Sequence, residues 1–241
     1  QQSMAVFPNP ATTEITIDLN SVDWKTKKSV VHIFNTQGAV YADMAETAKA
    51  LNLFLEGLKY AKKYNQVGVE VALYNSLGNL YNKLDGTQKA LSYYLQSVET
   101  SLKNKYKKPP VVAYSNISGI YAAVGKLDSA MFYVNLCVDY NLKINDKTGL
   151  ANNYITLSEI FLELKNKQKC LIYAQKAFDE AKSINDLYTL SHTCIQLSDA
   201  YYFNNNIQLA INALNDARTY ASKTGDIPVL ELSAENLSSY Y

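Results

Sequence analysis

The residues of this sequence that could do chemistry are few, and their spacing limits what they can do. The two histidines, His32 and His192, could share a metal ion or relay a proton if the fold brought them together. They occupy one position of a pattern that repeats every forty residues, four periods apart, so we expect them to be distant. The three cysteines, Cys137, Cys170 and Cys194, lack CxxC or metal-type spacing. We therefore predict no metal site and no cofactor.

Three carboxylates offer a second possibility. Glu159, Glu163 and Asp199 could form an acid/base pair, but their pattern favours a solvated helix surface or contact with a ligand. The sequence contains no glycine-rich phosphate loop, no HExxH and no nucleophile elbow. We therefore predict no catalytic residues and expect that the protein is not an enzyme.

The elements that position these side chains are defined by an internal repeat. Residues 74–81 (YNSLGNLY) recur without a gap as 114–121, 154–161 and 194–201, always forty residues apart. A fixed period of this size indicates stacked supersecondary units, each of which contacts its neighbours. Apolar positions within each unit step by three and four, which predicts two amphipathic helices per repeat.

The period also predicts how the chain is divided. We expect an N-terminal segment of uncertain structure at 1–30 and a solenoid over 31–241. At the repeat boundaries, Asn145, Asn185 and Gly225 suit the left-handed position that ends a helix, and an aspartate follows each of them to cap the next helix. The predicted repeats are 31–70, 71–110, 111–150, 151–190 and 191–230, followed by a half repeat at 231–241 that favours a longer parent chain.

Two sets of columns explain how such helices pack. One set carries small residues that let the two helices of a repeat approach closely. The other carries large residues that fill the space between helices. The small columns are Gly38, Gly78, Ser118, Ser158 and Ser198, and Ala50, Ala90, Ala130, Cys170 and Ala210; the large ones are Leu77, Ile117, Leu157 and Leu197, and Tyr41, Tyr81, Tyr121, Phe161 and Tyr201.

These columns resemble the tetratricopeptide repeat (TPR), with a leucine, a small residue and an aromatic in the first helix and an alanine early in the second. The departure is length, because the repeats here have forty residues. This long form resembles the sensor regions of bacterial signalling proteins, such as those of Bacteroidota. The resemblance implies an all-α fold, a right-handed α-solenoid of antiparallel helix pairs whose first helices line a concave groove.

The N-terminal segment allows more than one interpretation. Residues 14–19 alternate with period two, as a strand does. Equally, Asn9 could cap a helix that has Pro10 at its first position. Residues 7–41 also weakly resemble the start of the type IX secretion C-terminal sorting domain, a β-sandwich found on secreted proteins. From Val31 onward, however, the forty-residue register favours a first helical repeat.

Bulk composition narrows the possible partners. The net charge is +1, so no strong field points to nucleic acid or to an anionic membrane surface. No stretch of eighteen or more apolar residues is present, so we expect no membrane contact by this segment. The compartment stays open between the periplasm and the cytoplasm of a bacterium.

The predicted groove is the best candidate for function. The first helices carry asparagine and glutamine where ordinary helix surfaces favour lysine and glutamate. Because amides both donate and accept hydrogen bonds, such a series could hold an extended peptide. We predict a non-enzymatic module that binds a peptide or protein segment, as the sensor or scaffold of a larger bacterial signalling protein. The alternative is a structural scaffold that assembles a homo-oligomer or a secretion-associated complex through its helix faces. The predicted groove residues are Asn35, Asn75, Asn79, Asn82, Asn116, Asn152, Glu159, His192, Gln196, Asp199 and Tyr202.

Overall fold

The computed structural model describes residues 24–240, and every regular element in that range is an α-helix. The interpretations of residues 1–23 as a strand or a capped helix lie outside the described residues. The helices are α1 (Trp24–Asp43), α2 (Thr47–Lys63), α3 (Val67–Lys83), α4 (Thr87–Lys103), α5 (Val111–Ala123), α6 (Leu127–Ile144), α7 (Lys147–Glu163), α8 (Lys167–Ile184), α9 (Leu187–Phe203), α10 (Ile207–Thr224) and α11 (Ile227–Tyr240).

A residue in the left-handed conformation follows each helix from α1 to α10. These residues recur every twenty positions, so the forty-residue period contains two equivalent turns. Asparagine and glycine adopt this conformation readily, whereas other residues do so at a cost. The left-handed residues are Ala45, Asn65, Asp85, Lys105, Gly125, Asn145, Lys165, Asn185, Asn205 and Gly225.

The predicted boundary turns are confirmed in their details. Asn145, Asn185 and Gly225 are the left-handed C-caps of α6, α8 and α10. The next residue caps the following helix: the Asp146 carboxylate accepts a hydrogen bond from the backbone N–H of Gly149 at 3.0 Å. Asp186 does the same for α9 and Asp226 for α11. Each such cap satisfies backbone donors that a helix start leaves open.

Helix α5 departs from the period. First helices begin at 67, 147, 187 and 227, but α5 begins at Val111 instead of 107. Pro109 and Pro110 explain the delay, because a residue that precedes proline is excluded from the helical conformation. The displaced chain instead places the Tyr106 hydroxyl over Gly68, at the start of α3.

The small-residue columns do bring paired helices close together. A Cβ added at Gly38 would overlap the ring of Phe54, and one added at Gly78 would overlap the ring of Tyr94. Later repeats use serine at this position. The Ser118 hydroxyl, for example, donates to the Ala130 carbonyl at 2.8 Å across the helix pair.

The tyrosines of the large columns are packing residues, as predicted. In three successive repeats, one ring of the second helix lies against two rings of the first, with centroids 5.4–6.4 Å apart. The groups are Tyr93 with Tyr74 and Tyr81, Tyr133 with Tyr114 and Tyr121, and Tyr173 with Tyr154 and Phe161.

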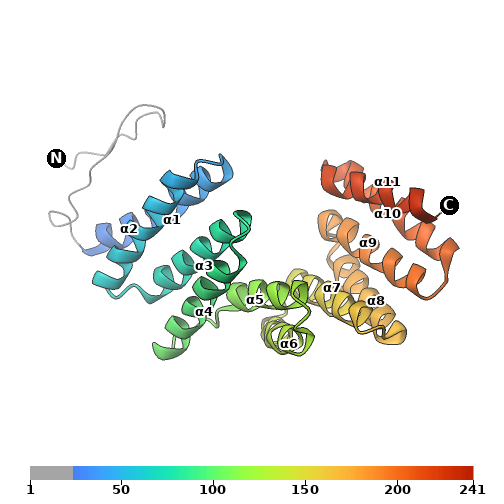
Figure 1. Ribbon diagram of the computed structural model, residues 1–241, viewed down its shortest axis with the longest axis horizontal. Coiled ribbons are helices and arrows are strands. Elements are labelled where there is room, and N and C mark those ends of the chain that lie inside the picture. The colour runs from blue at the N-terminus through green and yellow to red at the C-terminus, as the bar shows by residue number, and fades with distance from the viewer. Residues whose placement is uncertain (1–23, 241) are drawn as a thin grey trace.

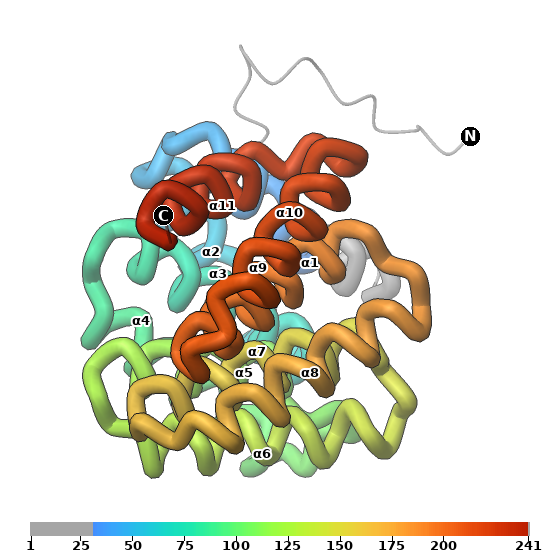
Figure 2. The backbone as a smooth tube through the Cα atoms, turned by 90° about the vertical axis from the view of Figure 1, so that its right-hand side faces the viewer, coloured from blue at the N-terminus to red at the C-terminus, as the bar shows by residue number. Residues whose placement is uncertain are grey.

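The stack of pairs curves into an arch. Helices α1 to α4 form one arm, α5 to α7 form the base, and α8 to α11 form the other arm (Figure 1). Seen from the side, the pairs follow one another from α6 at the bottom to α10 and α11 at the top (Figure 2). First helices of successive pairs contact each other (α1–α3, α5–α7, α7–α9, α9–α11), and each second helix contacts the first helix of the next pair. The first helices are therefore the inner layer of the curve. No helix within residues 24–240 is long and apolar enough to cross a bilayer.

Candidate functional site

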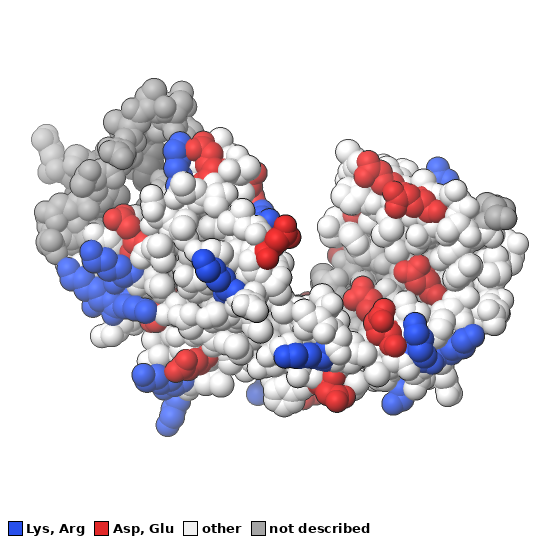
Figure 3. All heavy atoms as spheres, viewed as in Figure 1, with Lys and Arg blue, Asp and Glu red and all other residues white. Residues whose placement is uncertain are grey.

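The inner surface of the arch is hollowed between its two arms (Figure 3). Each first helix is covered by its own partner and by neighbouring helices, so its exposed residues fall on one stripe. On α7, for instance, Asn152 and Glu159 are exposed two turns apart, whereas Leu157 and Ile160 are buried. These stripes form one continuous concave face, which we take as the candidate site.

In the N-terminal half of this face, polar side chains connect one first helix to the next. Asn35 of α1 accepts a hydrogen bond from the Ser76 hydroxyl of α3 at 2.8 Å. Asn79 of α3 accepts one from the Asn116 amide of α5 at 3.2 Å. Asn79 Oδ1 also accepts from the Tyr94 hydroxyl at 2.7 Å. The amides here therefore hold adjacent repeats together, while Asn79 stays exposed to a ligand.

Two of the predicted groove residues are buried. The Asn75 amide donates to the Val71 carbonyl and the Ser97 hydroxyl, both at 3.1 Å, between α3 and α4. The Gln196 amide donates to the Ser158 hydroxyl at 3.0 Å, between α9 and α7. Their exposed fractions are only 9% and 5%, so their polar groups serve the interior and present little surface to a ligand.

Three further groove residues are exposed. Asn82, Asn152 and Tyr202 make no side-chain hydrogen bond to any described residue, and Tyr202 is 44% exposed. Asn82 lies on α3, Asn152 on α7 and Tyr202 on α9, so the three sample both arms and the base of the arch. Their donors and acceptors are available to a ligand.

His192 is tied to the C-terminal end of the solenoid. Its Nε2 lies 2.9 Å from Oδ2 of Asp226, the residue that caps α11, and its ring lies against Tyr188 with centroids 4.8 Å apart. His32 is exposed on α1, at the other end of the stack. The structure therefore keeps the two histidines apart, as the spacing predicted.

Asp199 is the most perturbed carboxylate of the concave face. Its Oδ1 accepts hydrogen bonds from Tyr240 at 3.2 Å and from Asn236 at 3.3 Å, both on α11. Burial raises the pKa of Asp199 to about 6, although the Tyr240 hydrogen bond opposes that shift. Burial raises the pKa of Tyr240 to about 12, so its hydroxyl stays protonated and can donate.

Glu159 lies one repeat before Asp199 on the same stripe. Its side chain is exposed on α7, a first helix of the inner layer. Desolvation there raises its pKa, and the negative charge of Asp199 raises that pKa further. The structure therefore places these two predicted site residues within electrostatic range of each other.

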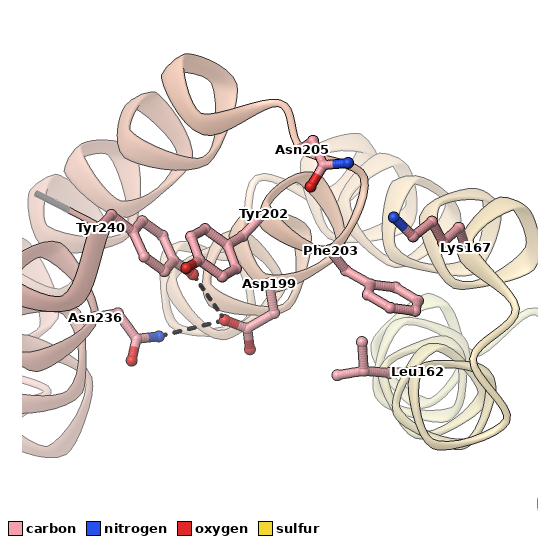
Figure 4. A pocket seen from close by; sticks show the side chains of 8 residues that line it. All are labelled: Leu162, Lys167, Asp199, Tyr202, Phe203, Asn205, Asn236 and Tyr240. Atoms are coloured by element: carbon pink, nitrogen blue, oxygen red, sulfur yellow. Dashed lines mark hydrogen bonds between the residues drawn. The ribbon is translucent and has the colours of Figure 1, made fainter.

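A cavity of about 480 Å³ opens beside Asp199 (Figure 4). The rings of Tyr202 and Tyr240 stack inside it with centroids 4.2 Å apart and planes 7° apart. Two helix pairs, α7/α8 and α9/α10, and helix α11 contribute to it. Its lining residues are Leu162, Lys167, Asp199, Tyr202, Phe203, Asn205, Asn236 and Tyr240.

Asn236 and Tyr240 were absent from the predicted site, although the sequence carries a signal for one of them. Asn236 continues the column of Ser76, Asn116 and Gln196 by one more period. Tyr240 aligns instead with Ile120, Ile160 and Ala200, which are buried. Tyr240 is partly buried against the core cluster that contains Leu214, and its longer side chain carries the hydroxyl to Asp199.

The three cysteines of the chain are poorly placed for thiol chemistry. All three cysteines are buried, and burial raises the pKa values of Cys137 and Cys194 to about 12, which suppresses the thiolate. Within residues 24–240, no three residues among His, Cys, Asp and Glu lie close enough together to hold a metal ion. What remains is a polar concave face with an aromatic pocket at its C-terminal end.

This architecture defines a TPR-like α-solenoid, and solved structures confirm the fold. The chain superimposes on BtubC (BKLC) from P. vanneervenii with a TM-score of 0.75 and 17% identity, covering 84% of each chain. It matches a signal transduction ATPase with a tetratricopeptide repeat sensor from Pyrococcus horikoshii with a TM-score of 0.71 and 17% identity, over 88% of this chain and 33% of that one.

A third similar structure is a Rap protein complexed with Competence and Sporulation Factor. The TM-score is 0.68 at 13% identity, over 87% of this chain and 64% of that one. At these identities the likeness establishes the fold: an all-α, right-handed solenoid of TPR-like helix pairs, as the sequence predicted. No curated protein sequence matches the chain.

The N-terminal resemblance is also found. Residues 5–59 match the family described as the secretion system C-terminal sorting domain. The described part of that match, 24–59, forms α1 and most of α2. The β-sandwich that the resemblance implies is therefore not formed by these residues. From Val31 they follow the repeat register instead, with Val31, Ala50 and Phe54 in the solenoid core.

Proposed function

We propose that the chain is a non-enzymatic module that binds a peptide or protein segment along its concave face. In this proposal it is the sensor or scaffold region of a larger bacterial signalling protein. The solenoid occupies 31–241, and the ligand lies across the first helices from Asn35 to Tyr202.

One observation carries the proposal: the concave face presents exposed amides on α3 and again on α7. Asn79, Asn82 and Asn152 each keep donors or acceptors that no described residue uses fully. An extended peptide exposes one donor and one acceptor at almost every residue. Amides spaced along a curved wall can bind such a backbone without selecting its sequence.

The similar structures support a binding role. One is named as a signal-transduction protein with a tetratricopeptide repeat sensor, and another is described as a complex with a factor. The fold that these proteins share with this chain presents a curved inner layer of first helices. The specific ligand and the signalling role are inferences about this chain.

Native mass spectrometry of the purified chain with a pool of random dodecapeptides tests the proposal. We expect peptides to be retained by the chain and lost when Asn152 is changed to tryptophan, which fills the groove at the base of the arch. Because Asn152 is exposed and its side chain makes no hydrogen bond to a described residue, the fold should tolerate Asn152→Trp.

Asn135→Trp is the matched control. Asn135 is equally exposed but lies on α6, in the outer layer. A chain that retains no peptide, or that loses peptides equally in both variants, would overturn the proposed groove. Unchanged melting temperatures for both variants would show that any loss is local.

A second candidate function is a scaffold that assembles copies of this chain. One observation favours it: apolar side chains are exposed at the turn that follows each of the first four first helices. Met44, Leu84, Val124 and Leu164 are 61%, 50%, 54% and 45% exposed and recur every forty residues along one edge. Light scattering across concentrations tests this role: assembly that Val124→Asp abolishes would support it, and a monomer at all concentrations would contradict it.

A further inference from the structure

Charge is separated between the two layers of the C-terminal half. The first helices α7, α9 and α11 carry five carboxylates and a single lysine, Lys147. That lysine lies at the start of α7 and is 4.0 Å from Glu180 of α8, away from the groove. The second helices α8 and α10 carry six basic residues and three acidic ones. The five inner carboxylates are Glu159, Glu163, Asp199, Glu231 and Glu235.

The same separation is visible on the molecular surface. Acidic side chains gather on the arm of the arch that holds α9 and α11, and basic ones lie along its lower edge and at its top (Figure 3). The other first helices differ: within residues 31–123, α1 carries Asp43, α3 carries one acidic and one basic residue, and α5 carries neither. Asp43 is paired with Lys83 of α3. The first helices of the C-terminal half are thus more acidic than those of the N-terminal half.

Asp199 lies in this acidic half without a cationic partner. Its Oδ1 accepts both hydrogen bonds from α11, and its Oδ2 accepts none from a described residue (Figure 4). No lysine or arginine of the described chain forms an ion pair with it. A half-buried carboxylate in this state gains free energy from a cation placed at its open oxygen.

The aromatic rings that line the pocket beside Asp199 also favour a cation. Aromatic faces attract cations, and Tyr202 remains 44% exposed while it stacks on Tyr240. Lys167, which also lines this pocket, makes such a contact with an aromatic ring: its Nζ lies 5.2 Å from the centre of the Phe203 ring. In the close-up, Lys167 and Asp199 stand at opposite sides of the pocket (Figure 4). The space next to Asp199 is therefore open to an external basic group.

We propose that this pocket binds a basic side chain, lysine or arginine, of a peptide that lies in the groove. The proposal rests on the proposed function and extends it, because it assigns the C-terminal half of the groove a specificity that the neutral amides cannot provide. The carboxylates of α7, α9 and α11 attract the basic segment, and Asp199 with Tyr202 fixes one side chain. Charge complementarity favours this occupant over nucleic acid or an anionic membrane, which the same carboxylates would repel.

Selection of phage-displayed random dodecapeptides on the purified chain tests the inference. We expect the selected peptides to carry lysine or arginine at one fixed position. Synthetic versions of one such peptide, with lysine, arginine, norleucine or citrulline at that position, then separate charge from shape. Loss of the charge should weaken binding at least about tenfold, and the ratio of lysine to arginine affinity identifies the preferred cation.

The matched variants are Asp199→Asn and Asp216→Asn. Both remove one negative charge from the fifth helix pair, but Asp216 is exposed on α10, in the outer layer. Asp199→Asn should abolish the preference for a basic residue, whereas Asp216→Asn should retain it. Asparagine can still accept from Tyr240 and Asn236, so the fold should persist; circular dichroism checks this.

The outcomes distinguish failure of the proposed basic-residue pocket from failure of the proposed peptide groove. Peptides that bind the groove without any basic preference, or a preference that Asp199→Asn leaves unchanged, would overturn this inference and leave the proposed function standing. Failure to select any peptide, together with no retained peptide by mass spectrometry, would overturn both.

Discussion

The first two helix pairs and the later pairs solve one packing problem in different ways. At the position where paired helices approach most closely, the early pairs have Gly38 and Gly78, and the rings of Phe54 and Tyr94 fill the space above them. The later pairs have serine. The hydroxyls of Ser118 and Ser158 donate to the backbone carbonyls of Ala130 and Cys170 at 2.8 and 2.9 Å, and that of Ser198 donates to the Tyr240 hydroxyl at 3.3 Å. The residues opposite these serines are correspondingly smaller, namely Val134, Ala174 and Leu214.

This difference extends to the concave face. The Tyr94 side chain crosses the interior, and its hydroxyl donates a hydrogen bond to Asn79 on the groove. A buried residue of the second helix therefore orients an amide of the early groove. In the last pairs, Ser158 is small, and its hydroxyl instead accepts from Gln196 of the next first helix. The contact between paired helices therefore supports a groove amide early in the stack, whereas Ser158 links both its own helix pair and the next repeat.

The largest expected effect comes from replacing the early glycine–aromatic packing with the later serine–aliphatic packing. Tyr94→Val alone removes a fully buried ring and should lower the free energy of unfolding by about 3 kcal/mol. Adding Gly78→Ser recreates the later arrangement, with a hydroxyl that can reach the Ala90 carbonyl. We expect a double-mutant cycle by urea denaturation to give a favourable coupling of roughly 1 kcal/mol or more. Simple additivity would show that the two positions do not pack as one unit.

Gly78→Ala tests the early solution directly. The added Cβ overlaps the Tyr94 ring, which cannot swing away because it is buried and bonded to Asn79. The free energy of unfolding should fall by about 1–3 kcal/mol. Gly119→Ala is the control, because a Cβ there meets nothing within 4 Å. In an exposed helix interior, alanine should raise stability by about 0.5–1 kcal/mol. Equal effects at both glycines would contradict the packing argument.

Asp199→Asn tests how a buried carboxylate affects stability at the C-terminal end of the groove. The pKa of Asp199 is raised to about 6, so its contribution to stability is present below about pH 4 and is lost as pH rises through 6. The variant should therefore be more stable than the wild type at pH 7.5, by roughly 1 kcal/mol after allowance for solvent screening. The difference should vanish near pH 4.

Three other titratable groups face Asp199 and must be considered in that experiment. Tyr240 faces it from α11, Glu159 from α7 and Lys167 from α8. Asn79→Asp is the reverse exchange in the same column of the early groove, and it should create a new loss of stability at neutral pH. Thermal unfolding from pH 4 to pH 8 measures both variants, and pH-independent curves would refute the assignment.

The smallest expected effect concerns the turns. Lys165 and Asn185 adopt nearly the same left-handed conformation, with φ of 57° and 53°, at consecutive turns. Asparagine tolerates this conformation and lysine does so less well, so Lys165→Gly should raise stability by about 0.5–1 kcal/mol. Asn185→Ala should lower it by a similar amount. A melting temperature that does not change in either variant would show that the turn conformation is not limiting.

Much of this fold was predictable because its interactions are local and periodic. The helix-ending residues Asn145, Asn185 and Gly225 and the caps beside them act within one turn of the chain, so their identity alone predicted the boundaries. The columns predicted which faces are buried. The start of α5 at Val111 was also within reach, because Pro109 and Pro110 forbid the earlier start.

The candidate site was less predictable, for physical reasons that particular residues illustrate. Asn75 and Asn79 lie one helical turn apart and both carry amides, yet one is buried against Ser97 and the other is exposed on the groove. A polar stripe in a sequence does not distinguish an amide that bonds inside a helix pair from one that faces solvent. Tyr240 belongs to a packing column, yet its hydroxyl lies 3.2 Å from Asp199, a contact that its column alone did not predict.

The sequence by itself thus determined the repeat, the helix pairs, the turns and the residues that fill the core. These follow from periodicity and from the conformational preferences of single residues. Only the tertiary structure decided which polar side chains share the concave face, because that depends on the curvature of the whole stack. It joined Asp199, Tyr202 and Tyr240 into one pocket and gave Asp199 its raised pKa, since desolvation arises from the surrounding protein and not from the residue type.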